Sequence, residues 1–179
     1  MLKVENLIQN VGIERKLFLD LLKDISEARA QWKPKLEDWN IIEITEHLYW
    51  AEQGGILGMW KTIHAIREGK IQRTFESIHR DMSIDQIIDL TWQAKEIVPA
   101  VAAPRLGGPV SFWIASLNGL QDILTAFGAD LLDDELRVQA HPHPISGAMD
   151  FQQRLEFLSF HFARHRGQVS RLLTEMANK

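Results

Sequence analysis

The sequence predicts an all-α four-helix bundle. Apolar residues recur at steps of three and four over several long stretches, which is the period of a helix that buries one face. No stretch alternates apolar and polar residues in the manner of a half-buried β-strand. Because the 179 residues show neither an internal repeat nor a shift in composition, we expect a single domain over residues 1–179.

We expect the first helix over residues 3–28 and the second over residues 41–68. The apolar residues of the first helix lie on one stripe, and a connector over 29–39 follows it, since the residue before a proline disfavours helical backbone. Asn40 begins the second helix as its N-cap, and Glu43, three residues later, completes a capping box. These local signals define the start of the second helix.

A polar connector over residues 69–82 precedes the second half of the chain. Its extended length exceeds that of the second helix, so it is long enough to cross the whole bundle. Ser83 begins the next helix, which weakens at Pro99 and ends at Pro104. A further helix is expected at about 111–128, so the third helix of the bundle is either broken or supplemented by this segment.

The last helix is expected over residues 150–177, with Asp150 as its N-cap. The preceding segment, 129–149, contains two X–Pro steps at 141–144, which favour extended backbone. Along the last helix runs an apolar seam with steps of three and four, which is typical of a bundle. Its members are Phe151, Leu155, Leu158, Phe162, His165, Val169, Leu172 and Met176.

Charge and composition exclude several classes of protein and site. The net charge is −4, and Lys and Arg form no run that would bind nucleic acid. There is no apolar leader and no apolar run of about 18 residues, so we expect a cytoplasmic protein with no membrane partner. The chain contains no cysteine, which excludes disulfides, zinc–thiolate sites, iron–sulfur clusters and a cysteine nucleophile. Any metal would therefore be held by His, Asp or Glu.

His161 and His165 are the strongest candidates for metal ligands. They lie one helical turn apart, so their imidazoles project from one face, and His165 belongs to the apolar seam. A buried histidine that only forms hydrogen bonds to a neighbour explains the same spacing. His47, at the border of the apolar stripe on the second helix, supplies a third nitrogen if the two helices face each other. Three protein ligands with open positions are typical of a catalytic metal site.

Several weaker signals each have two interpretations. Glu43 either orients the ring of His47 or only caps its helix, and Gln168 either lines the site or is a solvated or interhelical amide. His64 and His79 fall near the polar connector, and we expect both to be surface residues. Three glycines after His47 destabilise the second helix, which indicates either close helix packing or open space for a substrate beside the metal. They are Gly54, Gly55 and Gly58.

Three segments resemble the DinB/YfiT-like superfamily. Residues 39–48 (Trp-Asn-Ile-Ile-Glu-Ile-Thr-Glu-His-Leu) resemble the start of its second helix, where a Trp, a small polar cap and a His-Leu pair recur in this order. Residues 161–168 are similar to its final-helix motif, His-x-x-x-His with a following Gln, and residues 143–147 to its His-Pro-x-x-Gly loop. The likeness covers most of the chain in order and spacing, whereas residues 100–128 depart from it as an insertion or elaboration.

The resemblance implies a four-helix bundle with one divalent metal ion held by three histidines, which map onto His47, His161 and His165. Zinc, nickel, iron and manganese are the metals it implies. It also implies a homodimer that acts on a small-molecule substrate, as a transferase using a low-molecular-weight thiol or as a hydrolase. The alternative is a non-catalytic, stress-related dimeric bundle whose metal is structural or absent, because the sequence shows no evident general base besides the ligands.

Overall fold

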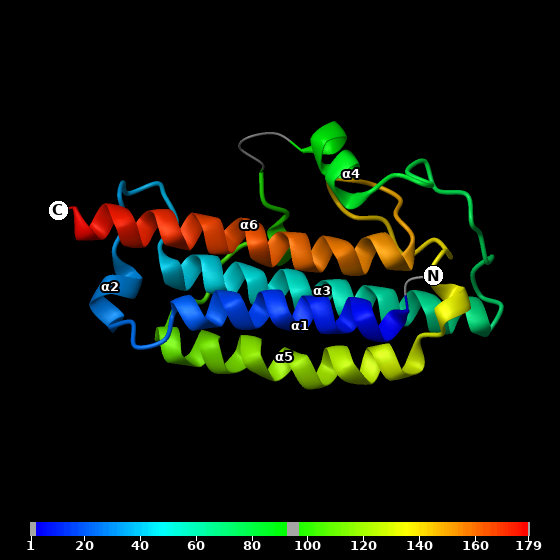
Figure 1. Ribbon diagram of the computed structural model, residues 1–179, viewed down its shortest axis with the longest axis horizontal. Coiled ribbons are helices and arrows are strands. Elements are labelled where there is room, and N and C mark those ends of the chain that lie inside the picture. The colour runs from blue at the N-terminus through cyan, green and yellow to red at the C-terminus, as the bar shows by residue number, and fades with distance from the viewer. Residues whose placement is uncertain (1–2, 93–96, 179) are drawn as a thin grey trace.

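Four long helices that pack side by side form the body of the protein (Figure 1). The computed structural model describes residues 3–92 and 97–178, and this part of the chain contains no β-strand. Helix α1 packs against α5 and α6, and so does α3. The cross-section is therefore a square with α1 diagonally opposite α3. The all-α four-helix bundle predicted from the sequence is confirmed. The four helices are α1 (Val4–Leu21), α3 (Ile41–Arg67), α5 (Val110–Asp130) and α6 (Phe151–Ala177).

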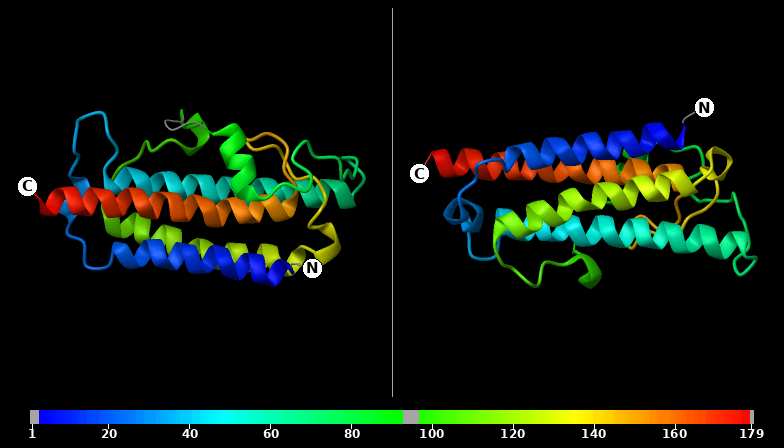
Figure 2. Two further views of the ribbon diagram at one scale, coloured as in Figure 1. Left: turned by 45° about the horizontal axis from the view of Figure 1, so that its top comes forward. Right: turned by 90° about the horizontal axis from the view of Figure 1, so that it is seen from below.

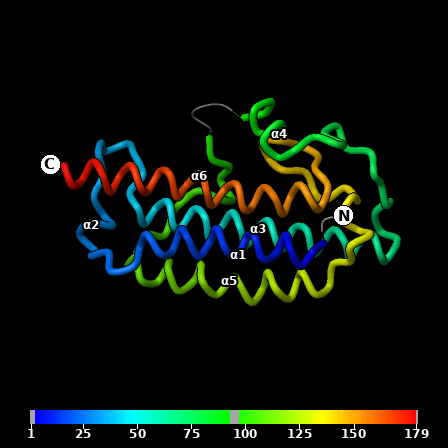
Figure 3. Tube along the Cα trace, viewed as in Figure 1, coloured from blue at the N-terminus to red at the C-terminus, as the bar shows by residue number. Residues whose placement is uncertain are grey.

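Neighbouring helices are parallel on two sides of this square. Helices α1 and α6 run in one direction, and α3 and α5 both run in the other, as Figures 1 and 3 show. Because α5 is parallel to its neighbour α3, the chain must return along the bundle between them. Residues 68–109, here called the crossover, make this return and include the short helix α4 (Ile84–Thr91) and the 3₁₀ turn η1 (Ala100–Ala102). The connector expected over 69–82 is one part of the crossover, and η1 packs against α3.

The first helix is shorter than its apolar stripe predicts. Asp24 has a φ of 63°, a left-handed conformation that interrupts a right-handed helix, and α1 ends before it. Ser26 then caps a separate helix, α2 (Glu27–Gln31). The prediction of one continuous helix over 3–28 was therefore wrong. The stripe misled because Leu22, outside the helix, is still fully buried.

The predicted caps of the second and last helices are present. The side chain of Asn40 accepts a hydrogen bond from the backbone N–H of Glu43 at 2.8 Å, and the carboxylate of Glu43 accepts one from the backbone N–H of Asn40 at 2.8 Å. Asp150 caps α6 by accepting from the backbone N–H of Gln153 at 2.8 Å. The predicted seam of α6 is buried as far as Leu172. None of the helices in the described residues is long and apolar enough to cross a membrane.

The third long helix of the bundle is α5 rather than the segment that begins at Ser83. The helix that Ser83 caps, α4, has only 8 residues, and Trp92 after it has extended backbone. The part of the expected helix at 93–96 lies outside the described residues. Helix α4 packs on the outside of α6 (Figure 2). The segment at about 111–128, which was expected to break or supplement the third helix, therefore forms one of the four main helices. The cluster that attaches α4 consists of Ile87, Ile88, Met149 and Phe157.

Two of the three glycines on α3 are in close contact with other side chains. A Cβ atom on Gly58 would lie 2.5 Å from the ring of His141, in the loop before α6. A Cβ atom on Gly55 would lie 3.5 Å from Leu158, whereas one on Gly54 would have no neighbour within 4 Å. Close packing is therefore the correct interpretation for Gly55 and Gly58. At Gly58, however, the close neighbour is a loop side chain and not another helix.

We expect alanine at the two ends of this glycine cluster to have opposite effects. Gly54→Ala should stabilise the protein by about 0.5–1 kcal/mol, because alanine restricts the unfolded chain and adds no clash. Gly58→Ala should destabilise it by about 1–3 kcal/mol, because the ring of His141 must move. Urea unfolding of both variants measures the difference, and two stabilising substitutions would contradict the contact described here.

Candidate metal centre

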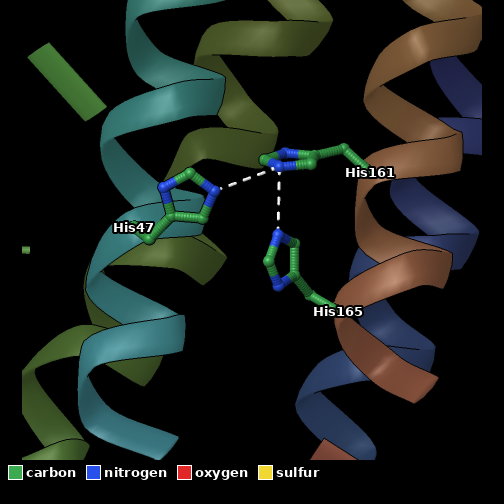
Figure 4. A group of neighbouring side chains, drawn as sticks. All are labelled: His47, His161 and His165. Carbon is green, nitrogen blue, oxygen red and sulfur yellow. Dashed lines mark hydrogen bonds between the residues drawn. The ribbon is translucent and has the colours of Figure 1, made fainter. Parts of the chain in front are cut away.

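Three histidines from α3 and α6 meet inside the bundle (Figure 4). His47 lies on α3, and His161 and His165 lie one turn apart on the side of α6 that faces it. The Nε2 atom of His161 is 3.1 Å from Nε2 of His47 and 3.1 Å from Nε2 of His165. All three side chains are buried. The structure thus brings together the three residues that the sequence singled out, and it places their two helices face to face.

Hydrogen bonds on the outer side of two rings direct their Nε2 atoms to the centre. His47 Nδ1 donates to the backbone carbonyl of Ala102 at 2.8 Å, and His165 Nδ1 donates to Oε1 of Gln168 at 2.8 Å. Because carbonyl oxygens only accept, each neutral ring has its proton on Nδ1 and turns a lone pair inward. His161 Nε2 has one proton at most, so at least one of the inward lone pairs has no donor. A cation at this point would satisfy all three nitrogens, so these residues fit a metal ion.

Burial keeps the three imidazoles neutral. It lowers the pKa of His165 to about 3 and the pKa of His161 well below its usual value, and the neighbouring rings add to both effects. The pKa of His47 is also lowered by burial, against the opposing hydrogen bond to Ala102. Neutral imidazole is the form that binds metals. An all-nitrogen donor set suits zinc, nickel and iron best, while manganese prefers oxygen ligands.

The carboxylate of Glu46, next to His47, fastens the crossover to α3. It accepts hydrogen bonds from the three backbone N–H groups of residues 105–107 at 2.8 to 3.0 Å. Burial raises the pKa of Glu46, but these hydrogen bonds and one from Trp50 Nε1 outweigh burial, so the pKa is lowered overall. The fastened segment follows Ala102, whose carbonyl orients His47. The role of Glu46 leaves no pattern in the sequence, because the backbone groups that it binds lie 59 to 61 residues later.

Aromatic side chains cover the centre on the side of α4. The ring of Phe157 stacks on the ring of His161, with centroids 5.5 Å apart. His143, from the loop before α6, lies 4.3 Å from Phe157 and 6.1 Å from Trp92, measured between ring centroids. Such walls limit the access of water and strengthen electrostatic interactions inside the site. The periodicity of α6 does not identify Phe157, because it lies beside the main seam and packs against the crossover.

The structure decides between the two interpretations of Glu43 and of Gln168. Glu43 completes the capping box and pairs with Lys33 at 2.8 Å, so the capping interpretation is correct. Gln168 neither lies free in solvent nor joins another helix, because its side chain binds Nδ1 of His165, three residues earlier on α6. It is therefore a positioning residue for one of the candidate ligands.

The two histidines near the connector 69–82 differ from each other. His64 has 53% of its side chain exposed and pairs with Asp130 at 2.7 Å, as expected of a surface residue. His79 is only 3% exposed, and its Nε2 atom is 2.7 Å from the backbone carbonyl oxygen of Ser146. The expected surface position of His79 was wrong because the loop before α6 packs over it.

Two comparisons with known proteins bear on the family and the fold of the chain. The sequence profile of the DinB superfamily matches residues 12–169. Among solved structures, the chain is similar to YfiT from Bacillus subtilis, which is described as a probable metal-dependent hydrolase with an unusual four-helix bundle topology. The TM-score is 0.61 at 12% sequence identity, and the match covers 97% of this chain and 87% of YfiT. At this identity the likeness shows a shared fold alone. No curated protein sequence matches the chain.

We expect Glu46→Gln to lower both stability and metal affinity. The amide nitrogen of glutamine cannot accept, so at least one N–H of residues 105–107 loses its partner, at a cost of about 1–3 kcal/mol. A looser crossover also releases the Ala102 carbonyl from His47, so metal affinity should fall about 10–100-fold. Urea unfolding and competition with a chelating dye measure these effects, with the exposed Glu68→Gln as control. A variant that binds metal as tightly as the wild type would refute the role assigned to Glu46.

Proposed function

We propose that this chain, which belongs to the DinB superfamily, is a metal-dependent enzyme that acts on a small molecule. In this proposal His47, His161 and His165 hold one divalent ion of zinc, nickel, iron or manganese. The supporting observation is the convergence of three neutral Nε2 atoms, of which no more than one can donate a hydrogen bond to another. When bound, the ion supplies Lewis-acid chemistry that makes water or a thiol nucleophilic near neutral pH.

Hydrolysis is the first candidate reaction, and transfer of a low-molecular-weight thiol is the second. YfiT, which shares the fold, is described as a probable metal-dependent hydrolase, and three protein ligands leave coordination positions open. Thiol transfer would require a thiol co-substrate, since the chain has no cysteine. Turnover measured with and without an added thiol separates the two reactions.

The residues of the chain itself have separable tasks in this proposal. The Ala102 carbonyl and Gln168 keep the inward nitrogens of two ligands unprotonated and fix the orientation of their rings. Phe157 and Trp92 exclude water from one side of the site and offer apolar contact to a substrate. The orientation of the ligand rings and the shielding of the site are thus assigned to residues of α6 and of the crossover.

A non-catalytic dimeric bundle is the competing proposal. It assigns the metal a structural task, so it predicts that metal removal lowers the melting temperature but changes no turnover. The homodimer and the cytoplasmic location expected from the sequence are likewise proposals. Size-exclusion chromatography with light scattering tests the dimer.

We expect His161→Ala to abolish metal binding. Outer hydrogen-bond partners of metal ligands are worth about 10–100-fold in affinity, and loss of the central ligand should cost more than that. Elemental analysis of protein purified without a histidine tag measures the bound metal directly. His64→Ala is the matched control, because His64 is exposed and lies outside the centre. If His161→Ala retains the metal content of the wild type, the ligand assignment fails.

Removal of the metal should abolish turnover reversibly. We expect the metal-loaded protein to turn over members of a panel of small esters, amides and thiol–acceptor pairs. After chelation the rate should fall to less than about one hundredth, and it should return when metal is restored. Melting curves of both forms control for unfolding. A folded, metal-loaded protein that processes no member of the panel favours the structural task for the metal.

A further inference from the structure

Arg154, on α6, is a buried cation that has no anionic partner among the described residues. Its side chain is only 4% exposed. Its Nη2 atom forms a hydrogen bond with Nε2 of His141 at 3.0 Å, and residues 3–92 and 97–178 offer its side chain no other. The Nε and Nη1 atoms, which carry three of the five N–H donors of a guanidinium, have no partner. Buried donors are nearly always satisfied, so this site needs an explanation.

The charge of Arg154 is not balanced by its surroundings. Burial lowers its pKa to about 10, which leaves the guanidinium protonated at neutral pH. Burial, together with the charge of Arg154, lowers the pKa of His141 to about 4 and that of His143 to about 3, so both rings are neutral. Asp150, the N-cap of α6 and four residues earlier, pairs with Arg137 at 3.0 Å. Within the described residues, no carboxylate forms an ion pair with Arg154, although burying an unpaired charge is costly.

Arg154 lies on the same side of α6 as the candidate metal ligands. It is seven residues before His161, which is close to two turns, or about 10 Å along the helix. Its guanidinium carbon is 6.0 Å from the ring centroid of Phe157, the ring that stacks on His161. Gly55 of α3 lies opposite, where a Cβ atom would be 3.8 Å from Nη2. Arg154 and the three-histidine centre therefore both lie between α6 and α3, with Phe157 beside both.

We propose that Arg154 binds an oxyanion, a carboxylate or a phosphate, between α6, α3 and the loop that carries His141. The planar guanidinium matches both groups through paired N–H···O bonds, and a bound anion would supply the charge and the acceptors that the protein leaves out. Water would satisfy the donors but not the charge. The assignment of the oxyanion to the substrate rests on the proposed function. The binding of an anion by Arg154 does not depend on that function. The ligand is thus either the acidic group of the substrate or a free anion.

Titration of the full-length protein with acetate and with inorganic phosphate tests the site. Calorimetry is run on the protein as purified and again after chelation, with chloride at equal ionic strength as the reference. We expect saturable binding in both forms, weakened about ten-fold or more in Arg154→Met and unchanged in Arg171→Met, an exposed arginine on the same helix. Absence of saturable binding to the wild type, or equal binding by Arg154→Met, would overturn the proposal.

Folding of the variants is checked by circular dichroism and thermal melting. Because Arg154 has no anionic partner in the described part of the chain, we expect Arg154→Met to melt no lower than the wild type when no oxyanion is added, which a purely structural arginine would not allow. If Arg154→Met does not fold, Arg154→Lys takes its place. Lysine keeps the charge but loses the planar fork, so it should bind both probes several-fold more weakly, and wild-type affinity in this variant would overturn the proposal.

A matched pair of substrates distinguishes the two sources of the anion. The metal-loaded protein is assayed with p-nitrophenyl acetate and with the p-nitrophenyl monoester of succinic acid, which adds a carboxylate. If the substrate carries the anion, Arg154→Met should lower kcat/KM about ten-fold or more for the acidic ester and leave the neutral one unchanged. Equal rates for both esters in variant and wild type would overturn the substrate assignment and leave a free anion. Absence of turnover with retained acetate binding would refute the proposed function and not the anion site.

Discussion

The hydrogen bonds between the Glu46 carboxylate and the backbone of residues 105–107 hold the candidate site in its shape. Parallel packing of α3 and α5 forces a long crossover, which packs on the bundle at α4 and η1 and has a polar anchor near the site. Glu46 supplies that anchor with an ionised carboxylate, for which backbone N–H groups are strong partners. With the crossover held in place, the Ala102 carbonyl accepts a hydrogen bond from Nδ1 of His47 and so fixes the proton of that ring on Nδ1. Topology and chemistry are therefore coupled through one side chain.

The polar groups inside this bundle fall into two kinds. Arg15 and Glu52 form a buried ion pair between α1 and α3, with Arg15 Nε donating at 3.1 Å, so each charge has its partner within the protein. The three histidines and Arg154 are different, because they retain lone pairs or N–H donors without partners. Buried polar groups without partners cost free energy of folding, and a protein retains them where another molecule completes the site. Arg154, His161 and His165 lie along the face of α6 that looks toward α3, and His47 lies opposite them on α3.

Two segments that pack against α6, the crossover and the loop before α6, contribute residues to the site. The crossover brings Trp92 and the Ala102 carbonyl, and the loop before α6 brings His141 and His143. Gly58 on α3 permits this arrangement, since any larger residue would meet the ring of His141. The bundle itself provides the rigid frame, and loops of low regularity carry much of what would contact a ligand, as is common in enzymes.

The sequence by itself determined the features that depend on neighbours within one helical turn. The caps at Asn40 and Asp150, the seam of α6 and the shared face of His161 and His165 all follow from spacing along a single helix. The same local logic also predicted that α1 would continue past Asp24, because an apolar stripe does not record a left-handed residue.

Only the tertiary structure decided which helices face each other and what lies between them. The approach of His47 to His161 joins residues 114 positions apart. The anchoring by Glu46, the burial of His79 and the isolation of Arg154 likewise depend on distant backbone and loop groups. Such contacts result from the packing of the whole bundle, where many weak interactions fix the direction of each helix, and no short stretch of sequence contains that information.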